Sequence, residues 1–144
     1  MNLQEITSLI VLKAFPDLLQ ERIHTEYALL EDSFFEYGIL GKDYFIEVKK
    51  SLETVDDQIV IGGIAHELCH IARDKKKGFF DSFLYKHNKY YRYMDERQTD
   101  LDVVLRGYGK NLMAFLKFRE TQTLSYENEG ITLIELEKLR YTRW

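Results

Sequence analysis

The chain has 144 residues, of which 45% are hydrophobic and 31% are charged, and its formal net charge is −4. A chain of this length is typical of one domain with a buried core, so we predict a single domain spanning residues 1–144. The net negative charge argues against a general nucleic-acid-binding protein, which normally carries a strong basic excess.

The cysteine content and the apolar runs predict a cytoplasmic protein without a membrane span. Cys69 is the only cysteine, which excludes an intramolecular disulfide and favours a reducing compartment. The N-terminal stretch lacks the positively charged start of a secretory signal, and Lys13 interrupts its apolar residues. The longest apolar run near the histidines, 59–65, is far shorter than the about 20 residues that a spanning helix needs.

The first part of the chain predicts a helix followed by a small sheet. Apolar residues recur at helical spacing within Leu3–Phe15, and Pro16 opens a further helical turn. Strand-like segments follow at 25–40 and 44–50, with turn residues at 41–43 between them. We expect two or three strands in a mostly antiparallel sheet.

The rest of the chain predicts helices, and the order of elements therefore indicates an α+β fold. Thr54 with Asp57 resembles a helix cap, and Thr132 with Glu135 forms a T-x-x-E capping box. The expected helices are Val55–Lys75, which carries the motif described next, Met94–Arg106, which ends at the sequence GYG, a short helix over 110–118, and a last helix over 133–141.

Residues 66–70 read HELCH and match the pattern H-E-x-x-H. Residues four apart share one face of a helix, so the imidazoles of His66 and His70 can bind one zinc ion at about 2.0–2.1 Å. Glu67 would project towards the open side of the metal and take a proton from the attacking water. The alternative is a helix with two idle histidines. The surrounding apolar residues predict burial, however, which is unfavourable for imidazoles without partners.

A catalytic zinc site needs three protein ligands and an open position. In the sequence DERQTD, Glu96 and Asp100 are also four residues apart, and Glu96 could complete a set of two histidines and one glutamate. Asp100 could accept a hydrogen bond from a ligating histidine and so orient its ring. Asp95 and Asp102 are rivals for these roles, or else solvated surface charges. We predict one zinc ion per chain.

Three further residues of the motif helix have two interpretations each. Gly62 and Gly63 lie inside the predicted helix, where each is unfavourable by roughly 0.5–1 kcal/mol relative to alanine. They indicate either a close approach of another element beside the ligands or ordinary helix packing. Cys69 points about 100° away from His70 on a helix, so a buried, unreactive thiol is expected rather than a sulfur ligand.

The pairing of HELCH with ERQTD resembles the gluzincin zinc metallopeptidases, and it is most similar to the small soluble minigluzincins. These proteins combine a helix bearing H-E-x-x-H with a later helix bearing E-x-x-x-D. The resemblance covers about 44–109 of the chain and implies zinc endopeptidase activity with Glu67 as the catalytic residue. The matching positions are His66, Glu67 and His70, followed by Glu96 and Asp100.

The resemblance carries three further implications. A peptide substrate would lie extended along the outer edge strand of the sheet, which we place at 43–49. A tyrosine, histidine or arginine would stabilise the oxyanion, and the stretch 125–144 could lie in the cleft of a latent form or pack as an ordinary helix. The candidates for the oxyanion role are His87, Tyr85, Tyr90 and Arg97.

A second hypothesis is a non-catalytic zinc protein. The segment 75–93 interleaves aromatic residues with lysines and arginines, which can stack bases and hold phosphates of a nucleic acid, or bind a protein partner. Its aromatic residues could equally belong to the core. In a third interpretation the zinc is purely structural, although such a site has no need for a carboxylate at the position of Glu67.

Overall fold

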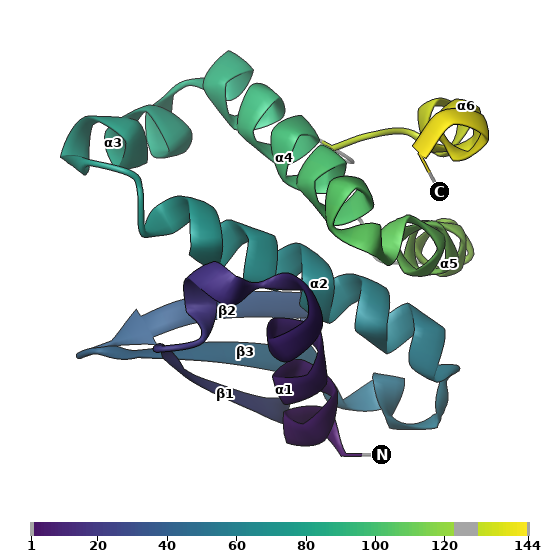
Figure 1. Ribbon diagram of the computed structural model, residues 1–144, viewed down its shortest axis with the longest axis horizontal. Helices are drawn as coiled ribbons and strands as arrows, with labels where there is room; N and C mark the ends of the chain where they lie inside the picture. The colour runs from purple at the N-terminus through teal and green to yellow at the C-terminus, as the bar shows by residue number, and fades with distance from the viewer. Residues whose placement is uncertain (1, 123–129, 144) are drawn as a thin grey trace.

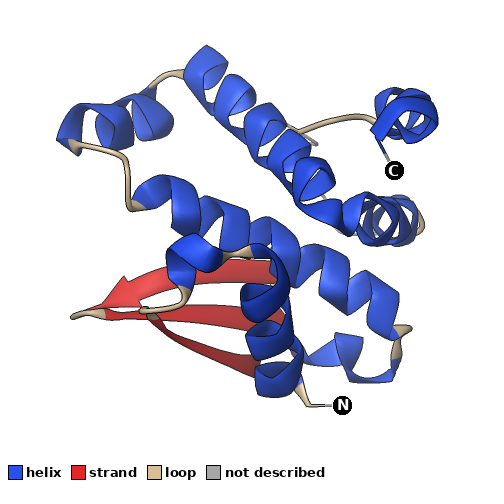
Figure 2. Cartoon of the chain, in the orientation of Figure 1, coloured by secondary structure: helices blue, strands red, loops and turns tan. Residues whose placement is uncertain are grey.

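The computed structural model describes residues 2–122 and 130–143 and has the α+β fold that the sequence predicts (Figures 1 and 2). A helix precedes three strands, and a series of helices follows them. The strands are β1 (Arg22–Ala28), β2 (Phe35–Leu40) and β3 (Asp43–Lys49). The α-helices are α1 (Leu3–Ala14), α2 (Asp57–Asp74), α3 (Phe79–His87), α4 (Lys89–Val103), α5 (Gly109–Glu120) and α6 (Leu133–Arg143).

The three strands form a mixed sheet in the order β1-β3-β2. β2 and β3 are antiparallel and follow each other through a turn in which Gly41 has φ +65°, a left-handed conformation that favours glycine. β1 pairs with β3 in parallel, so the expected antiparallel arrangement holds for one of the two pairings. The alternation of side chains indicates which face a residue occupies but not the direction of the neighbouring strand, so the sequence did not reveal the parallel pairing.

The segment 43–49 is the central strand of the sheet, and its placement at the outer edge was wrong. β3 is hydrogen-bonded to β1 on one side and to β2 on the other. Its residues Ile46 and Val48 are fully buried, as expected of a strand with neighbours on both sides. β1 and β2 are therefore the two outer strands.

The outer edge of β1 is covered by a side chain of α1. The Gln4 amide donates from Nε2 to the carbonyl of Ile23 at 2.9 Å, and its Oε1 accepts from the backbone N–H of Thr25 at 3.0 Å. The Thr25 hydroxyl also lies 2.7 Å from that of Thr7 on α1. The Gln4 amide thus occupies the place that a peptide group of a further strand would take.

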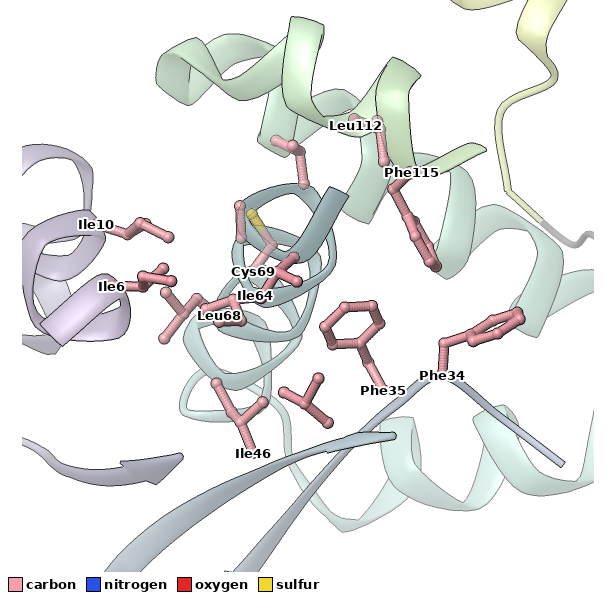
Figure 3. Close-up of a cluster of buried hydrophobic side chains, with 14 of the residues drawn as sticks. Ile6, Ile10, Phe34, Phe35, Ile46, Ile64, Leu68, Cys69, Leu112 and Phe115 are labelled. Carbon is pink, nitrogen blue, oxygen red and sulfur yellow. The ribbon is translucent and has the colours of Figure 1, made fainter. Parts of the chain in front are cut away.

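Helix α2 lies between the sheet and the helices α4 and α5 (Figure 1). Its apolar face contributes Ile64 and Leu68, both fully buried, to a cluster that includes Ile46 of β3 and Leu112 of α5 (Figure 3). The helix begins at Asp57, two residues later than predicted. The reason is that Asp56 rather than Thr54 caps it, through a carboxylate that accepts from the Gln58 N–H at 2.8 Å.

Both glycines of α2 are in close contact with other elements. A Cβ on Gly62 would lie 2.2 Å from the backbone oxygen of Asn111, so α2 and α5 approach each other along their backbones. A Cβ on Gly63 would lie 2.1 Å from the ring of Phe35 on β2. The two interpretations of the pair are therefore both correct, one for each glycine.

Side-chain caps and a glycine with positive φ set the ends of helices in the second half of the chain. α4 starts at Lys89, earlier than predicted, because the Asn88 side chain accepts from the Tyr91 N–H at 3.0 Å. After α4 the chain bends through a π-helical segment, Val104–Tyr108, in which Gly107 has φ +97°. The capping box before α6 is confirmed.

Within residues 2–122 and 130–143, no helix combines the length and apolar composition that crossing a membrane requires.

Candidate metal centre

Two helices bring His66, His70 and Glu96 together. The histidines lie one turn apart on α2, and Glu96 faces them from α4. The two histidine Nε2 atoms are 3.1 Å apart, and Glu96 Oε2 lies 3.4 Å from His66 Nε2 and 3.2 Å from His70 Nε2. Three donor atoms thus form a nearly equilateral triangle.

The triangle has the dimensions of a zinc site. A tetrahedral ion with bonds of about 2.0–2.1 Å holds its ligand atoms about 3.3–3.4 Å apart, close to the three distances observed. Two histidines and one glutamate are also a known ligand set of catalytic zinc. These residues therefore fit the ion, and they are the same three that the sequence proposes as ligands.

Asp100 fixes the ring of the first histidine. Its Oδ1 lies 2.7 Å from His66 Nδ1, and the side chain is buried among α2, α4 and the segment before α6. A carboxylate at this distance accepts a hydrogen bond from Nδ1–H and holds the ring with Nε2 directed at the other donor atoms. The Oδ2 atom of Asp100 accepts a hydrogen bond from the backbone N–H of Ile131 at 2.9 Å, a contact that sequence reasoning missed.

Asp95 is not a solvated surface charge. It is 3% exposed, and its Oδ1 accepts from Arg73 at 2.9 Å and pairs with Lys77 at 3.1 Å. Its Oδ2 faces Nδ1 of His70 at 4.0 Å. Its position directly before Glu96 on α4 was the available signal, because the neighbour of a ligand on a helix facing α2 also reaches that helix.

Two tyrosines contact the other two side chains of the triangle. The Tyr85 hydroxyl on α3 donates to Oε1 of Glu96 at 2.5 Å and so orients the carboxylate. The Tyr37 ring on β2 stacks on the His70 ring, with centroids 5.3 Å apart and an angle of 11° between the planes. Its hydroxyl donates to Asp74 at 2.5 Å. No sequence pattern had singled out Tyr37, because its contact with α2 depends on how the sheet packs.

A pocket of about 420 Å³ opens beside the donor atoms. It is lined by Asp32, Ser33, Phe34, Phe35, Glu36, Tyr37, His66, Glu67, His70, Tyr85, Glu96, Phe115 and Arg119. Of the four residues considered for the oxyanion, only Tyr85 lines it. Tyr90 is 83% exposed, Arg97 pairs with Glu135 on α6, and His87 contacts Phe83. Arg119 is a basic group of this wall that the sequence did not reveal.

The charges of the site are strongly coupled. Burial raises the pKa of Glu67, and the neighbouring His66 and His70 oppose this rise only partly. Burial would also raise the pKa of Glu96, but hydrogen bonding to the two imidazoles holds it well below its usual range. Burial alone would lower the pKa of His66, but the Asp100 carboxylate outweighs this effect and holds the pKa well above its usual value. A carboxyl with a raised pKa suits proton transfer near neutral pH.

The remaining predicted features contribute no atom to the triangle of donor atoms. The Cys69 sulfur points into the apolar cluster, and burial raises the pKa of its thiol (Figure 3). In the segment 75–93, Lys75 pairs with Glu21 and Lys77 pairs with Asp74 and Asp95. Of the stretch 125–144, residues 125–129 and 144 lie outside the described residues, and none of 130–140 lines the pocket.

The fold and the site define an α+β domain with a candidate metal centre of two histidines and one glutamate. Comparison of the chain with protein-family models, with curated proteins and with solved structures finds no match in any of the three. The resemblance to the gluzincins therefore rests on the two motifs and the order of elements, and it stays a prediction.

Proposed function

We propose that the protein is a zinc-dependent metallopeptidase in which His66, His70 and Glu96 hold the metal. The observation that carries this proposal is the triangle of donor atoms, 3.1–3.4 Å on each side, in the wall of a pocket that also contains Glu67. A zinc ion held there would polarise a peptide carbonyl and lower the pKa of a water molecule.

Glu67 is the catalytic base in this proposal. It follows the first ligand on α2, lines the pocket and is 7% exposed, so bulk water does not compete for its carboxylate. Its raised pKa suits it to accept a proton from the attacking water and then to donate that proton to the leaving amine. A purely structural metal site would use neither this carboxylate nor the pocket.

The substrate in this proposal is a peptide that enters along β2 rather than β3. Residues 32–37, at the start of β2, form one side of the pocket, and β2 is an outer strand of the sheet. An outer strand offers backbone groups to an extended chain. Phe35 and Phe115, whose rings meet edge to face at 5.2 Å, add an apolar wall for a substrate side chain.

The test measures zinc content and peptide hydrolysis on wild type, Glu67→Gln and His70→Ala in parallel. We expect about one zinc per chain in wild type and in Glu67→Gln, with hydrolysis of a peptide mixture in wild type alone. His70→Ala should lose both. Full activity of Glu67→Gln would contradict the role of Glu67, and wild type without zinc after incubation with the metal would contradict the site.

A further inference from the structure

We infer that the backbone at residues 130 and 131 is a positioning element of the metal centre, because it holds Asp100 against His66. The inference rests on the proposed metal site but assigns a role to a part of the chain that holds no ligand. The segment that leads into α6 is therefore part of the site.

Asp100 joins this segment to the first ligand. One carboxylate oxygen, Oδ1, lies 2.7 Å from His66 Nδ1, and the other, Oδ2, accepts from the Ile131 N–H at 2.9 Å. Asp100 is 3% exposed, so water cannot readily replace either partner. Loss of the Ile131 contact would leave a buried carboxylate oxygen without this donor and free the group to rotate away from His66.

Position 130 requires a glycine because there is no space for a side chain, and not because of its backbone conformation. A Cβ built on Gly130 would lie 2.0 Å from Asp100 Oδ2, whereas its φ lies outside the left-handed range. Any larger residue must push the carboxylate or the segment itself aside. The absence of a side chain at position 130 is therefore what lets Ile131 reach Asp100.

The segment is anchored through α6, which packs against α5 and is ion-paired to α4. Ile131 is 2% exposed and Leu136 on α6 is fully buried. Arg97, the neighbour of Glu96 on α4, donates to both carboxylate oxygens of Glu135, which also completes the capping box of Thr132. The same stretch of α4 thus carries the proposed ligand Glu96, the carboxylate of Asp100 that contacts His66, and the ion-pair partner of α6.

The consequence is a fixed orientation of the His66 ring. With Asp100 held on Nδ1, Nε2 is directed at His70 and Glu96. When Asp100 is displaced, the ring is free to turn, and Nε2 leaves the triangle of donor atoms. Gly130→Ala is therefore expected to lower zinc affinity without altering any residue that touches the ion.

The test has one readout with metal and one without. In crystal structures of the zinc-free protein, the Asp100 carboxylate should lie against His66 Nδ1 in wild type and be displaced from it in Gly130→Ala. Zinc affinity, measured by competition with a chelator, should fall about 10–100-fold in Gly130→Ala, as expected for loss of an outer-sphere partner. Gly78→Ala, with no atom within 4 Å of its added Cβ, is the matched control.

A double-mutant cycle separates positioning from general loosening. If Gly130 acts through Asp100, Gly130→Ala in an Asp100→Asn background should lower zinc affinity no further than Asp100→Asn alone. A purely structural effect would instead be additive. Should Gly130→Ala fail to fold, Arg97→Met, which removes the ion pair between α4 and α6, should lower zinc affinity, while Arg140→Met should not.

The outcomes distinguish a failure of this inference from a failure of the proposed function. Wild-type affinity together with an unchanged Asp100–His66 contact in Gly130→Ala would overturn the inference, as would fully additive losses in the cycle. Wild type that binds no zinc would contradict the proposed function, and the Asp100–His66 contact in the zinc-free protein would then decide this inference by itself.

Discussion

Oδ2 of Asp95 lies 4.0 Å from Nδ1 of His70. Within the part of the chain that the structure describes, neither of these buried atoms has a hydrogen-bond partner. A metal ligand of this type nearly always donates its second ring N–H to a carboxylate, a carbonyl or water. Asp95 therefore faces Nδ1 of His70 as Asp100 faces Nδ1 of His66, but at 4.0 Å instead of 2.7 Å.

We predict that Asp95→Asn weakens zinc binding by about 10–100-fold, because a neutral amide is a poorer acceptor for the His70 N–H. Zinc affinity by chelator competition is the measurement. Asp102→Asn is the control, because Asp102 also accepts from Arg73 but has no contact with His70. Equal affinities of the Asp95 and Asp102 variants would show that the carboxylate does not act on the ligand.

Removal of the proposed zinc ion is expected to destabilise the protein. An ion bound only to the folded state adds about 2.7 kcal/mol when its free concentration is 100 times the dissociation constant, or roughly 5–10 °C in melting temperature. Differential scanning calorimetry with zinc and with excess EDTA measures this difference. His70→Ala should melt at the same temperature in both conditions, and a wild type equally insensitive to EDTA would refute the site.

Gly62→Ala should destabilise the fold by about 1–3 kcal/mol. The new methyl group would lie 2.2 Å from the Asn111 backbone oxygen, and a backbone atom, unlike a flexible side chain, cannot turn away. The free energy of unfolding in urea measures the effect. Gly38→Ala on β2, where an added Cβ meets no atom within 4 Å, should differ little from wild type. Similar stabilities for both variants would mean that α2 and α5 can separate freely.

The Arg97–Glu135 pair should make stability depend on pH. Hydrogen bonding from Arg97 lowers the pKa of Glu135 from 4.5 to about 2, so the pair stabilises the fold above pH 4.5 and loses this effect as the pH falls towards 2. We predict that Glu135→Gln costs about 0.5–1 kcal/mol at pH 7, given the partial exposure of the pair, and nothing near pH 2. Glutamine still suits the capping box, so this variant tests the charge alone.

Urea titrations at several pH values between 2 and 7 measure this difference between wild type and Glu135→Gln. Glu137→Gln is the control, because its partner Arg140 lies on the same helix. A difference between wild type and Glu135→Gln that stays constant over the whole range would contradict the assignment.

Arg119→Met should lower the turnover number for peptide hydrolysis by about 100-fold while zinc content stays near one per chain. Arg119 lies in the pocket wall, where a guanidinium can donate hydrogen bonds to an oxyanion, and burial lowers its pKa. Steady-state kinetics on a fluorogenic peptide is the measurement, with the exposed Lys117→Met as control. A change confined to KM would assign Arg119 to substrate binding instead.

Helical spacing was sufficient to single out the residues that the structure brings together at the centre. His66 with His70, and Glu96 with Asp100, are pairs four apart, and a helix places such pairs on one face whatever surrounds it. That the two faces meet was inferred from the need of a catalytic zinc for a third ligand and was also implied by the family resemblance, and the structure places them against each other.

The remainder of the site depends on packing that no local pattern records. Tyr37 comes from β2, Arg119 from α5 and Gly130 from the segment before α6, and none of them is close in sequence to the motifs. The mixed sheet was missed for a related reason, since strand direction is decided by connections and not by alternation. Asp95 was the exception, because its position beside Glu96 could have indicated burial.

The Gln4 amide on the outer edge of β1 has a consequence for how the molecule can associate with other chains. Two backbone groups of that edge are already hydrogen-bonded to the amide, and α1 lies alongside, so a further strand cannot be added there without displacing the helix. β2 is then the side on which the sheet can be extended. Strand addition, whether by a ligand or by a second copy during aggregation, is thereby directed to the side that borders the pocket.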